Sequence, residues 1–269
     1  MYYPAPLIKG SVIAITAFSA GIKASHEARY QHVVEGLKEK GFQIREGECL
    51  RGNHHYASAP AEQRAAELMS FLLDDTVHAI AAPWGGELAM ELLPLLDFNA
   101  LLKAKPKWLF GFSDISTITS VLTFKLKWAS AHSANLMDLS PLETNALTAN
   151  TLNYLATMKG KSFTQISSSA YSQQWPDICA HPKAILQDIL QDIQATQWQW
   201  LVKPEDGRRV EGHLIGGCWD TLIHLFDTPY LDLAAYAQQC DEGILLYLEN
   251  VEMTPADLTR AILSMTFKG

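Results

Sequence analysis

The fold is decided by the stretch at residues 108–116, which has the sequence Trp-Leu-Phe-Gly-Phe-Ser-Asp-Ile-Ser. Its apolar run predicts a buried strand ending at Gly111, and a helical pattern begins directly after Asp114. A serine at such a turn is exposed at the carboxyl edge of a sheet, beside backbone N–H groups that favour negative charge. Ser113 is therefore a candidate nucleophile. The pattern differs from Gly-x-Ser-x-Gly because Ile115 replaces the second glycine. A simple helix cap at Ser113 or Asp114 remains an open alternative.

Short apolar runs alternate with helical patterns through the first half of the chain. We expect strands at 12–16, 42–45, 77–82, 108–111 and 128–131. We expect helices at 28–40, 59–73, 87–93 and 115–126. Such alternation requires right-handed crossovers between parallel strands. The sequence thus predicts an α/β fold with an N-terminal, mostly parallel sheet flanked by helices.

A change of pattern divides the chain into three parts. A helix at 144–158 closes an N-terminal nucleophile domain at 1–161, and a polar, aperiodic connection follows at 162–182. The remainder, 183–269, predicts a smaller C-terminal α/β domain. Its expected strands are 198–202, 210–215 and 244–248, and its expected helices are 219–226 and 255–265.

Composition limits the function classes. The 269 residues are 48% hydrophobic, with a formal net charge of −8, which argues against a general nucleic-acid binder. The four cysteines form no Cys-x-x-Cys pair, so a zinc ribbon or thioredoxin-type site is not expected. We find no signal peptide and no apolar run of about 20 residues, the length of a membrane span. We therefore expect a soluble, cytoplasmic protein without a membrane partner.

Two further segments carry candidate chemistry. The pair Gly85-Gly86 follows an expected strand, and its backbone N–H groups suit half of an oxyanion hole, an anion site or a plain tight turn. Glu249 ends an apolar strand, where it either orients a histidine or faces solvent. The histidines form no zinc pair and no phosphate-binding loop occurs, so we predict neither metal nor cofactor.

Taken together, these segments resemble the LD-carboxypeptidase family of serine peptidases. The resemblance covers essentially the whole chain. Each piece is weak alone, but the ordered set is specific. The matching segments are 7–15, 84–86 with 92–97, 106–107, 111–115, 212–217, 228–230 and 244–249.

The resemblance implies a mechanism. Ser113 would be the nucleophile and form an acyl-enzyme, and Glu249 would orient a histidine that acts as general base. The backbone N–H groups of Gly86 and Asp114 would form the oxyanion hole. A homodimer is also implied.

Two features are closer to one branch of the family, the carboxypeptidases that give self-immunity to microcin C, a peptide–nucleotide antibiotic. These are the stretch 131–137 and the connection with Trp175. Trp175 would stack on a substrate ring or simply anchor its loop. The resemblance also marks Cys218 and Asp220 as substrate-binding. The implied substrate is a small peptide or a peptide–nucleotide conjugate, and the sequence does not separate the two.

Two departures from the family pattern affect the expected activity. Cys218 stands where the family often has asparagine. The family's histidine lies beyond the helix that here ends at 265–269, so we expect a truncated C-terminal domain and an inactive chain. A peptide- or nucleotide-binding protein without hydrolysis is the alternative. An amidohydrolase with a non-peptide substrate is a third interpretation.

Overall fold

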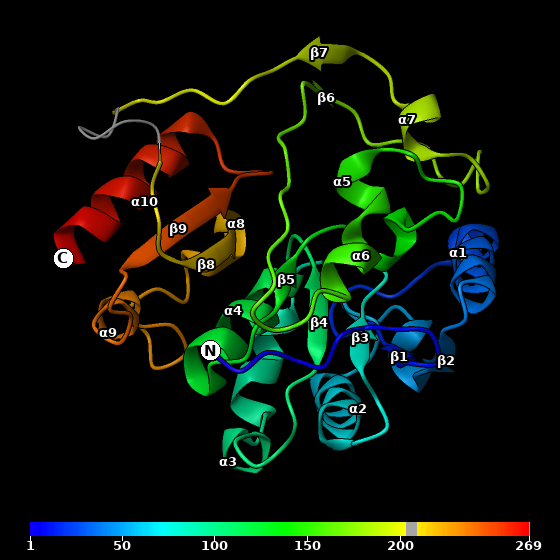
Figure 1. Cartoon of the computed structure of the whole chain (residues 1–269), viewed down its shortest axis with the longest axis horizontal. Coiled ribbons are helices and arrows are strands. Elements are labelled where there is room, and N and C mark those ends of the chain that lie inside the picture. Colours follow the sequence, from blue (N-terminus) through cyan, green and yellow to red (C-terminus); the bar gives the residue numbers. More distant parts are fainter. Residues whose placement is uncertain (203–208, 269) are drawn as a thin grey trace.

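A five-stranded parallel sheet forms the centre of the protein in its computed structural model, which describes residues 1–202 and 209–268 (Figure 1). The strand order is β2-β1-β3-β4-β5. The strands are β1 (Val12–Ile15), β2 (Gln43–Glu46), β3 (Ala79–Ala81), β4 (Trp108–Gly111) and β5 (Ala131–His132). The order reverses direction between β1 and β3, and loops at the carboxyl ends beside such a switch point form ligand sites in open α/β sheets.

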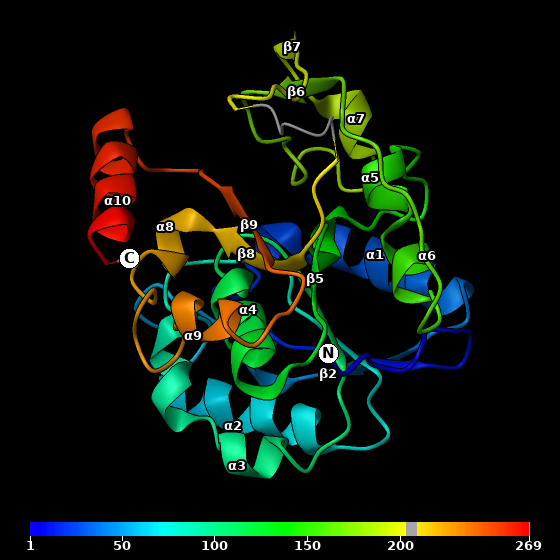
Figure 2. The ribbon, with the colours of Figure 1, turned by 60° about the vertical axis from the view of Figure 1, so that its left-hand side comes forward.

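Helices cover both faces of this sheet, as the sequence predicted. An apolar core lies on each face of the sheet, and alternate residues of β1 point into opposite cores. Ile13 and Ile15 pack with α1 (Glu27–Glu39), whereas Ala14 packs with α2 (Ala61–Leu73) and α4 (Ile115–Leu126). The strands are apolar on both sides because both faces are buried, as is usual for parallel sheets. Figures 1 and 2 show α1 and α2 as separate layers.

Two of the expected helices take other forms. The expected helix at 87–93 is the 3-10 helix η3 (Ala89–Leu95), which contains Pro94. The expected helix at 144–158 is divided into α5 (Ala146–Ala149) and α6 (Thr151–Leu155), because Asn150 ends the first and begins the second. The other short helices are η1 (Ala24–His26), η2 (Glu48–Leu50), α3 (Phe98–Leu101) and η4 (Leu136–Asp138).

The polar segment between the two larger parts has local structure of its own. Its strands β6 (Ala170–Ser172) and β7 (Ile193–Ala195) pair antiparallel, and α7 (Leu186–Ile189) lies between them in sequence. The expected strand at 198–202 is wrong. Trp198 and Leu201 are 88% and 97% exposed. These apolar side chains are therefore not buried, and the segment forms no strand.

The C-terminal part contains the parallel strands β8 (His213–Cys218) and β9 (Ile244–Glu249), with α8 (Trp219–Leu222), α9 (Leu233–Ala237) and α10 (Pro255–Lys268). Its apolar side chains join the core beneath α4. Ser120 Oγ on α4 donates a hydrogen bond of 2.7 Å to the Gly216 carbonyl of β8. Our expectation of a truncated second domain needs correction, because the C-terminal domain is present with paired strands and a core shared with α4.

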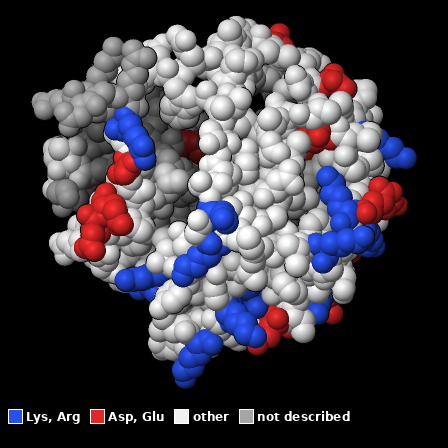
Figure 3. Space-filling model, viewed as in Figure 1, with Lys and Arg blue, Asp and Glu red and all other residues white. Residues whose placement is uncertain are grey.

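Surface and cysteine features complete the description. Figure 3 shows Lys and Arg interspersed with Asp and Glu on one face. All four cysteines are free thiols. Within residues 1–202 and 209–268, none of the helices combines the length and the apolar character that crossing a membrane requires.

Candidate active site

Ser113 lies on a strained turn between β4 and α4. Its φ is +62°, in the left-handed region that non-glycine residues rarely adopt. The preceding Gly111 has φ +140°, and a Cβ there would lie 2.5 Å from Asn135 Oδ1. That Asn135 oxygen accepts a hydrogen bond of 2.9 Å from the Phe112 N–H. The turn therefore has the geometry of a nucleophile elbow, in which a sharp strand-to-helix turn exposes the serine.

The Gly85-Gly86 pair packs directly against this turn. A Cβ on Gly85 would lie 2.7 Å from Ser113 Cβ and 2.8 Å from the Asp114 backbone nitrogen. Gly86 has φ +142°, and a Cβ on it would lie 2.7 Å from the Ala20 nitrogen. Glycine is required at both positions, because a side chain at residue 85 would collide with Ser113 and one at residue 86 would collide with Ala20.

Asp114 supports the turn from inside the protein. Its side chain is 1% exposed. The carboxylate accepts hydrogen bonds from Ser19 Oγ at 2.6 Å, the Ala89 N–H at 2.8 Å and Thr117 Oγ1 at 2.8 Å. Burial raises the pKa of Asp114, and these donors oppose the rise. Asp114 also begins α4, so its backbone N–H has no partner within the helix.

Glu249 at the end of β9 reaches the same turn from the other domain. Burial raises the pKa of Glu249, and the nearby Ser113 backbone N–H and Cys218 side chain oppose that rise. Its Oε1 is buried and has no hydrogen-bond partner among the described residues. A buried carboxylate oxygen without a donor is costly, so this position is suited to a donor group.

The other two predicted residues of this domain lie behind the turn. Cys218 is 2% exposed, and burial raises the pKa of its thiol to about 12. It is therefore a neutral thiol at ordinary pH, which is a poor nucleophile. Asp220 accepts backbone hydrogen bonds of 2.8–3.0 Å from residues 251, 252 and 253. Burial acts to raise the pKa of Asp220, but these donors together hold it below its usual value. A substrate contact for either residue stays a prediction.

A cavity of about 350 Å³ opens in front of Ser113. Trp175 is 74% exposed at its rim. Its ring lies parallel to Phe112, with centroids 6.2 Å apart and an interplanar angle of 8°. Of the predicted site residues, Gly86, Ser113 and Trp175 line the cavity, whereas Asp114, Cys218, Asp220 and Glu249 do not.

Sequence reasoning missed several lining residues. These are His26, Trp84, Phe112, Asn135 and Asp138. Asn135 and Asp138 form a reciprocal capping box at η4 that fixes the floor of the cavity. The 131–137 stretch was noticed only as a family signature, although an Asn-x-x-Asp spacing after a strand already indicates such a cap.

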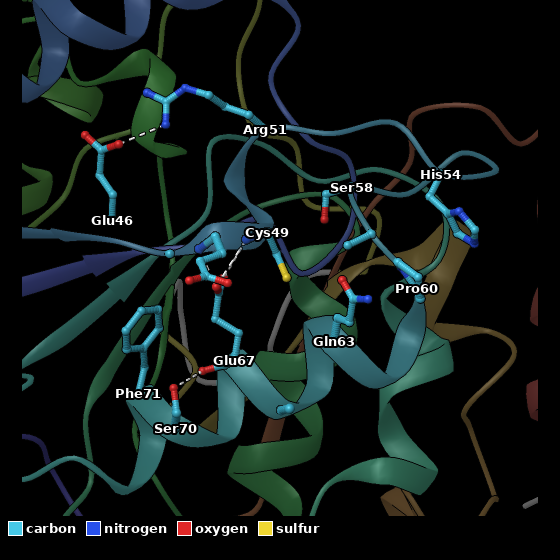
Figure 4. A pocket seen from close by; sticks show the side chains of 14 residues that line it. Glu46, Cys49, Arg51, His54, Ser58, Pro60, Gln63, Glu67, Ser70 and Phe71 are labelled. Carbon is cyan, nitrogen blue, oxygen red and sulfur yellow. Dashed lines mark hydrogen bonds and ion pairs between the residues drawn. The ribbon is translucent and has the colours of Figure 1, made fainter.

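A second, larger cavity lies at the β2 edge of the sheet, with a volume of about 790 Å³ (Figure 4). Charged side chains that line this cavity form hydrogen bonds and ion pairs with other lining residues. Glu67 on α2 accepts the backbone N–H groups of Glu48 and Cys49, and Arg51 pairs with Glu46. Burial raises the pKa of the Cys49 thiol to about 11, so this thiol is neutral at ordinary pH and a poor nucleophile.

In the described part of the chain, no cluster of three or more His, Cys, Asp or Glu side chains is placed to hold a metal ion.

The fold is an α/β fold with a parallel sheet, and at its carboxyl edge a strained strand-to-helix turn packs against a Gly-Gly loop. The chain belongs to the LD-carboxypeptidase family. The family model described as LD-carboxypeptidase N-terminal domain matches residues 13–133, and the one described as LD-carboxypeptidase C-terminal domain matches residues 211–269. The family resemblance in the sequence is thus confirmed.

Individual relatives agree with this assignment. A Vibrio cholerae protein with a provisional carboxypeptidase name is 27% identical over 96% of this chain and 75% of its own length. The microcin C7 self-immunity protein MccF of Escherichia coli is 30% identical over 45% of this chain and 37% of its own length. The apo structure of wild-type MccF superposes with a TM-score of 0.80 at 20% identity, over 98% of this chain and 76% of that one. At that identity the superposition shows the fold alone.

Proposed function

We propose that the protein is a serine carboxypeptidase that hydrolyses an amide bond near a free carboxylate. Ser113 Oγ attacks the carbonyl carbon, and its proton passes to a base. The tetrahedral intermediate then expels the amine, which takes up that proton, and leaves an acyl-enzyme that water hydrolyses. The N–H groups of Gly86 and Asp114 stabilise the oxyanion. The observation that carries the proposal is Ser113 at φ +62°, on a turn against which the Gly85-Gly86 loop packs.

We propose that the general base is an imidazole group that Glu249 orients. In a serine–histidine–carboxylate triad, the carboxylate accepts a hydrogen bond from the imidazole and stabilises its protonated form. The buried, unpartnered Oε1 of Glu249 is suited to that bond. Since no described residue donates to this oxygen, we propose that residues 1–202 and 209–268 have little hydrolytic activity by themselves.

The substrate is proposed to be a small peptide or a peptide–nucleotide conjugate. Solved MccF structures contain glutamyl sulfamoyl guanosine, aspartyl sulfamoyl adenosine or adenosine monophosphate, and a Pseudomonas aeruginosa relative is named murein tetrapeptide carboxypeptidase. The parallel rings of Phe112 and Trp175 at the cavity rim favour a ligand with a planar ring, because aromatic faces stack on bases. We therefore prefer the nucleotide conjugate.

Chemical rescue by imidazole tests the mechanism. Free imidazole should occupy the donor position beside Glu249 and accelerate hydrolysis of aspartyl sulfamoyl adenosine. We expect the acceleration to disappear in Ser113→Ala and to fall strongly in Glu249→Gln. Thermal unfolding of both variants checks that they are folded. Equal rates in wild type and Ser113→Ala, with or without imidazole, would refute a serine mechanism. Retained ligand stabilisation in that case would favour a binding protein.

Three accompanying assignments remain proposals. We propose a homodimer, as the family resemblance implies, and light scattering after gel filtration tests it. We also propose a cytoplasmic location, which cell fractionation tests. We also retain the division at residues 161 and 182, which limited proteolysis tests because exposed connections are cut first.

A further inference from the structure

We infer that Arg29 is a positioning residue that holds the loop at residues 173–192 against the cavity, and thereby holds Trp175 beside Phe112. The inference deepens the proposed function, because it rests on Trp175 being part of the substrate site. It starts from a buried cation far from Ser113 in sequence, to which neither the family resemblance nor the proposed mechanism assigns a role.

The 173–192 loop is closed at its base but exposed over much of its length. Strands β6 and β7 pair Ser172 with Ile193, and Ser172 Oγ donates to the Gln191 carbonyl at 2.6 Å. Trp175 and many of the polar loop residues are exposed. A loop of this kind needs an anchor at its far side if one of its side chains is to keep a fixed position.

Arg29 on α1 supplies such an anchor. Its side chain is fully buried. Nη1 donates to the Ala184 carbonyl at 2.6 Å and to the Pro182 carbonyl at 3.3 Å, both in the loop. Nε donates to the Met137 carbonyl at 2.9 Å, and Met137 lines the cavity. One guanidinium group therefore joins the loop, the cavity floor and the α1 core.

Two carboxylates keep this guanidinium charged and extend the anchor. Burial lowers the pKa of Arg29, and Asp138 and Glu143 oppose that shift. Glu143 also accepts the Leu186 backbone N–H at 3.2 Å, at the start of α7. In Figures 1 and 2, α7 lies beside α5 above α1. Hydrogen bonds with charged partners are stronger than neutral ones, so the anchor is concentrated in these few contacts.

Hydrogen exchange tests the anchor without requiring hydrolysis. In Arg29→Met, which keeps most of the side-chain volume, we expect amides of residues 177–188 to exchange at least tenfold faster. Arg64→Met is the matched control. Arg64 is 1% exposed and donates to the Ala59 and Phe18 carbonyls, but it makes no hydrogen bond to the loop. Arg29→Lys, which keeps the charge, should give an intermediate rate and is available if the methionine variant does not fold.

Adenosine monophosphate is the probe for the link to Trp175. We expect Arg29→Met to weaken its binding at least fivefold, and to have no further effect in a Trp175→Ala background. Wild-type exchange in a folded Arg29 variant would overturn the anchor. The positioning role would be overturned if Arg29→Met exchanges faster but binds adenosine monophosphate like wild type, while Trp175→Ala binds it more weakly. If Trp175→Ala binds like wild type, the nucleotide assignment fails, while the exchange data still decide the anchor.

Discussion

Replacing Gly217 with alanine should weaken the packing of the C-terminal domain against α4 and lower the stability of the protein. Gly217 has φ +142°, and a Cβ there would lie 2.5 Å from Ser116 Cβ and closer still to its Oγ. These atoms belong to the buried face of α4. The next residue, Cys218, donates its backbone N–H to Ser116 Oγ at 3.0 Å and lies opposite Glu249 in the strand register. The new methyl group therefore lies at the contact between β8 and α4, the helix that follows Ser113.

The expected cost has two parts. A non-glycine residue at this φ costs roughly 1–3 kcal/mol, and overpacking a close contact costs roughly another 1–3 kcal/mol. We take about 4 kcal/mol for their sum. The entropy of unfolding is about 2.1 cal/mol/K per residue, or roughly 0.6 kcal/mol/K for this chain of 269 residues. The unfolding midpoint should therefore fall by about 7 °C.

Calorimetry of Gly217→Ala beside Gly243→Ala measures this cost. Gly243 also has a positive φ, +75°, but a Cβ there would meet no atom within 4 Å. Its variant should lose only the backbone part, about 1–2 kcal/mol, and shift by about 2–3 °C. Equal shifts in the two variants would refute the close approach of β8 to α4. A selective loss of imidazole-rescued hydrolysis in Gly217→Ala would connect that approach to Glu249.

Three further predictions concern the site. Gly85→Ala should lower the imidazole-rescued, Ser113-dependent hydrolysis about 100-fold, because the new Cβ displaces the serine by roughly 1 Å; an unchanged kcat in imidazole would contradict this. Burial raises the pKa of Asp138 to about 6, so its ionisation opposes folding above that pH. Asp138→Asn should therefore be most stable relative to wild type above pH 6 and lose that advantage towards pH 4, as urea titrations at several pH values would reveal. Asp220→Ala should cost about 1–3 kcal/mol in urea unfolding, because three backbone N–H groups lose their acceptor.

Local patterns predicted the elements that have strong periodicity or clear boundaries. The β4–α4 unit matches its prediction because an apolar run, a turn and a buried helix follow one another without interruption. The expected strand at 198–202 failed because its sequence, Trp-Gln-Trp-Leu-Val, is rich in apolar and aromatic residues that favour strands whether or not a partner strand exists. The helix at 144–158 failed because two short helices form instead: α5 begins after Asn145, whose side chain accepts the Leu147 N–H, and α6 begins after Asn150.

The sequence by itself determined Ser113 as the residue at the critical turn, because that turn depends on neighbours within a few positions. It also determined the parallel sheet and the family, through the repeated alternation of strands and helices and the order of the matching segments along the chain. Only the tertiary structure decided which distant groups meet that turn. Glu249 reaches Ser113 because glycines let β8 approach α4 closely, and Arg29 reaches the Trp175 loop because α1 packs beneath it. Such contacts depend on backbone separations of a few ångströms across the core, which local periodicity does not encode.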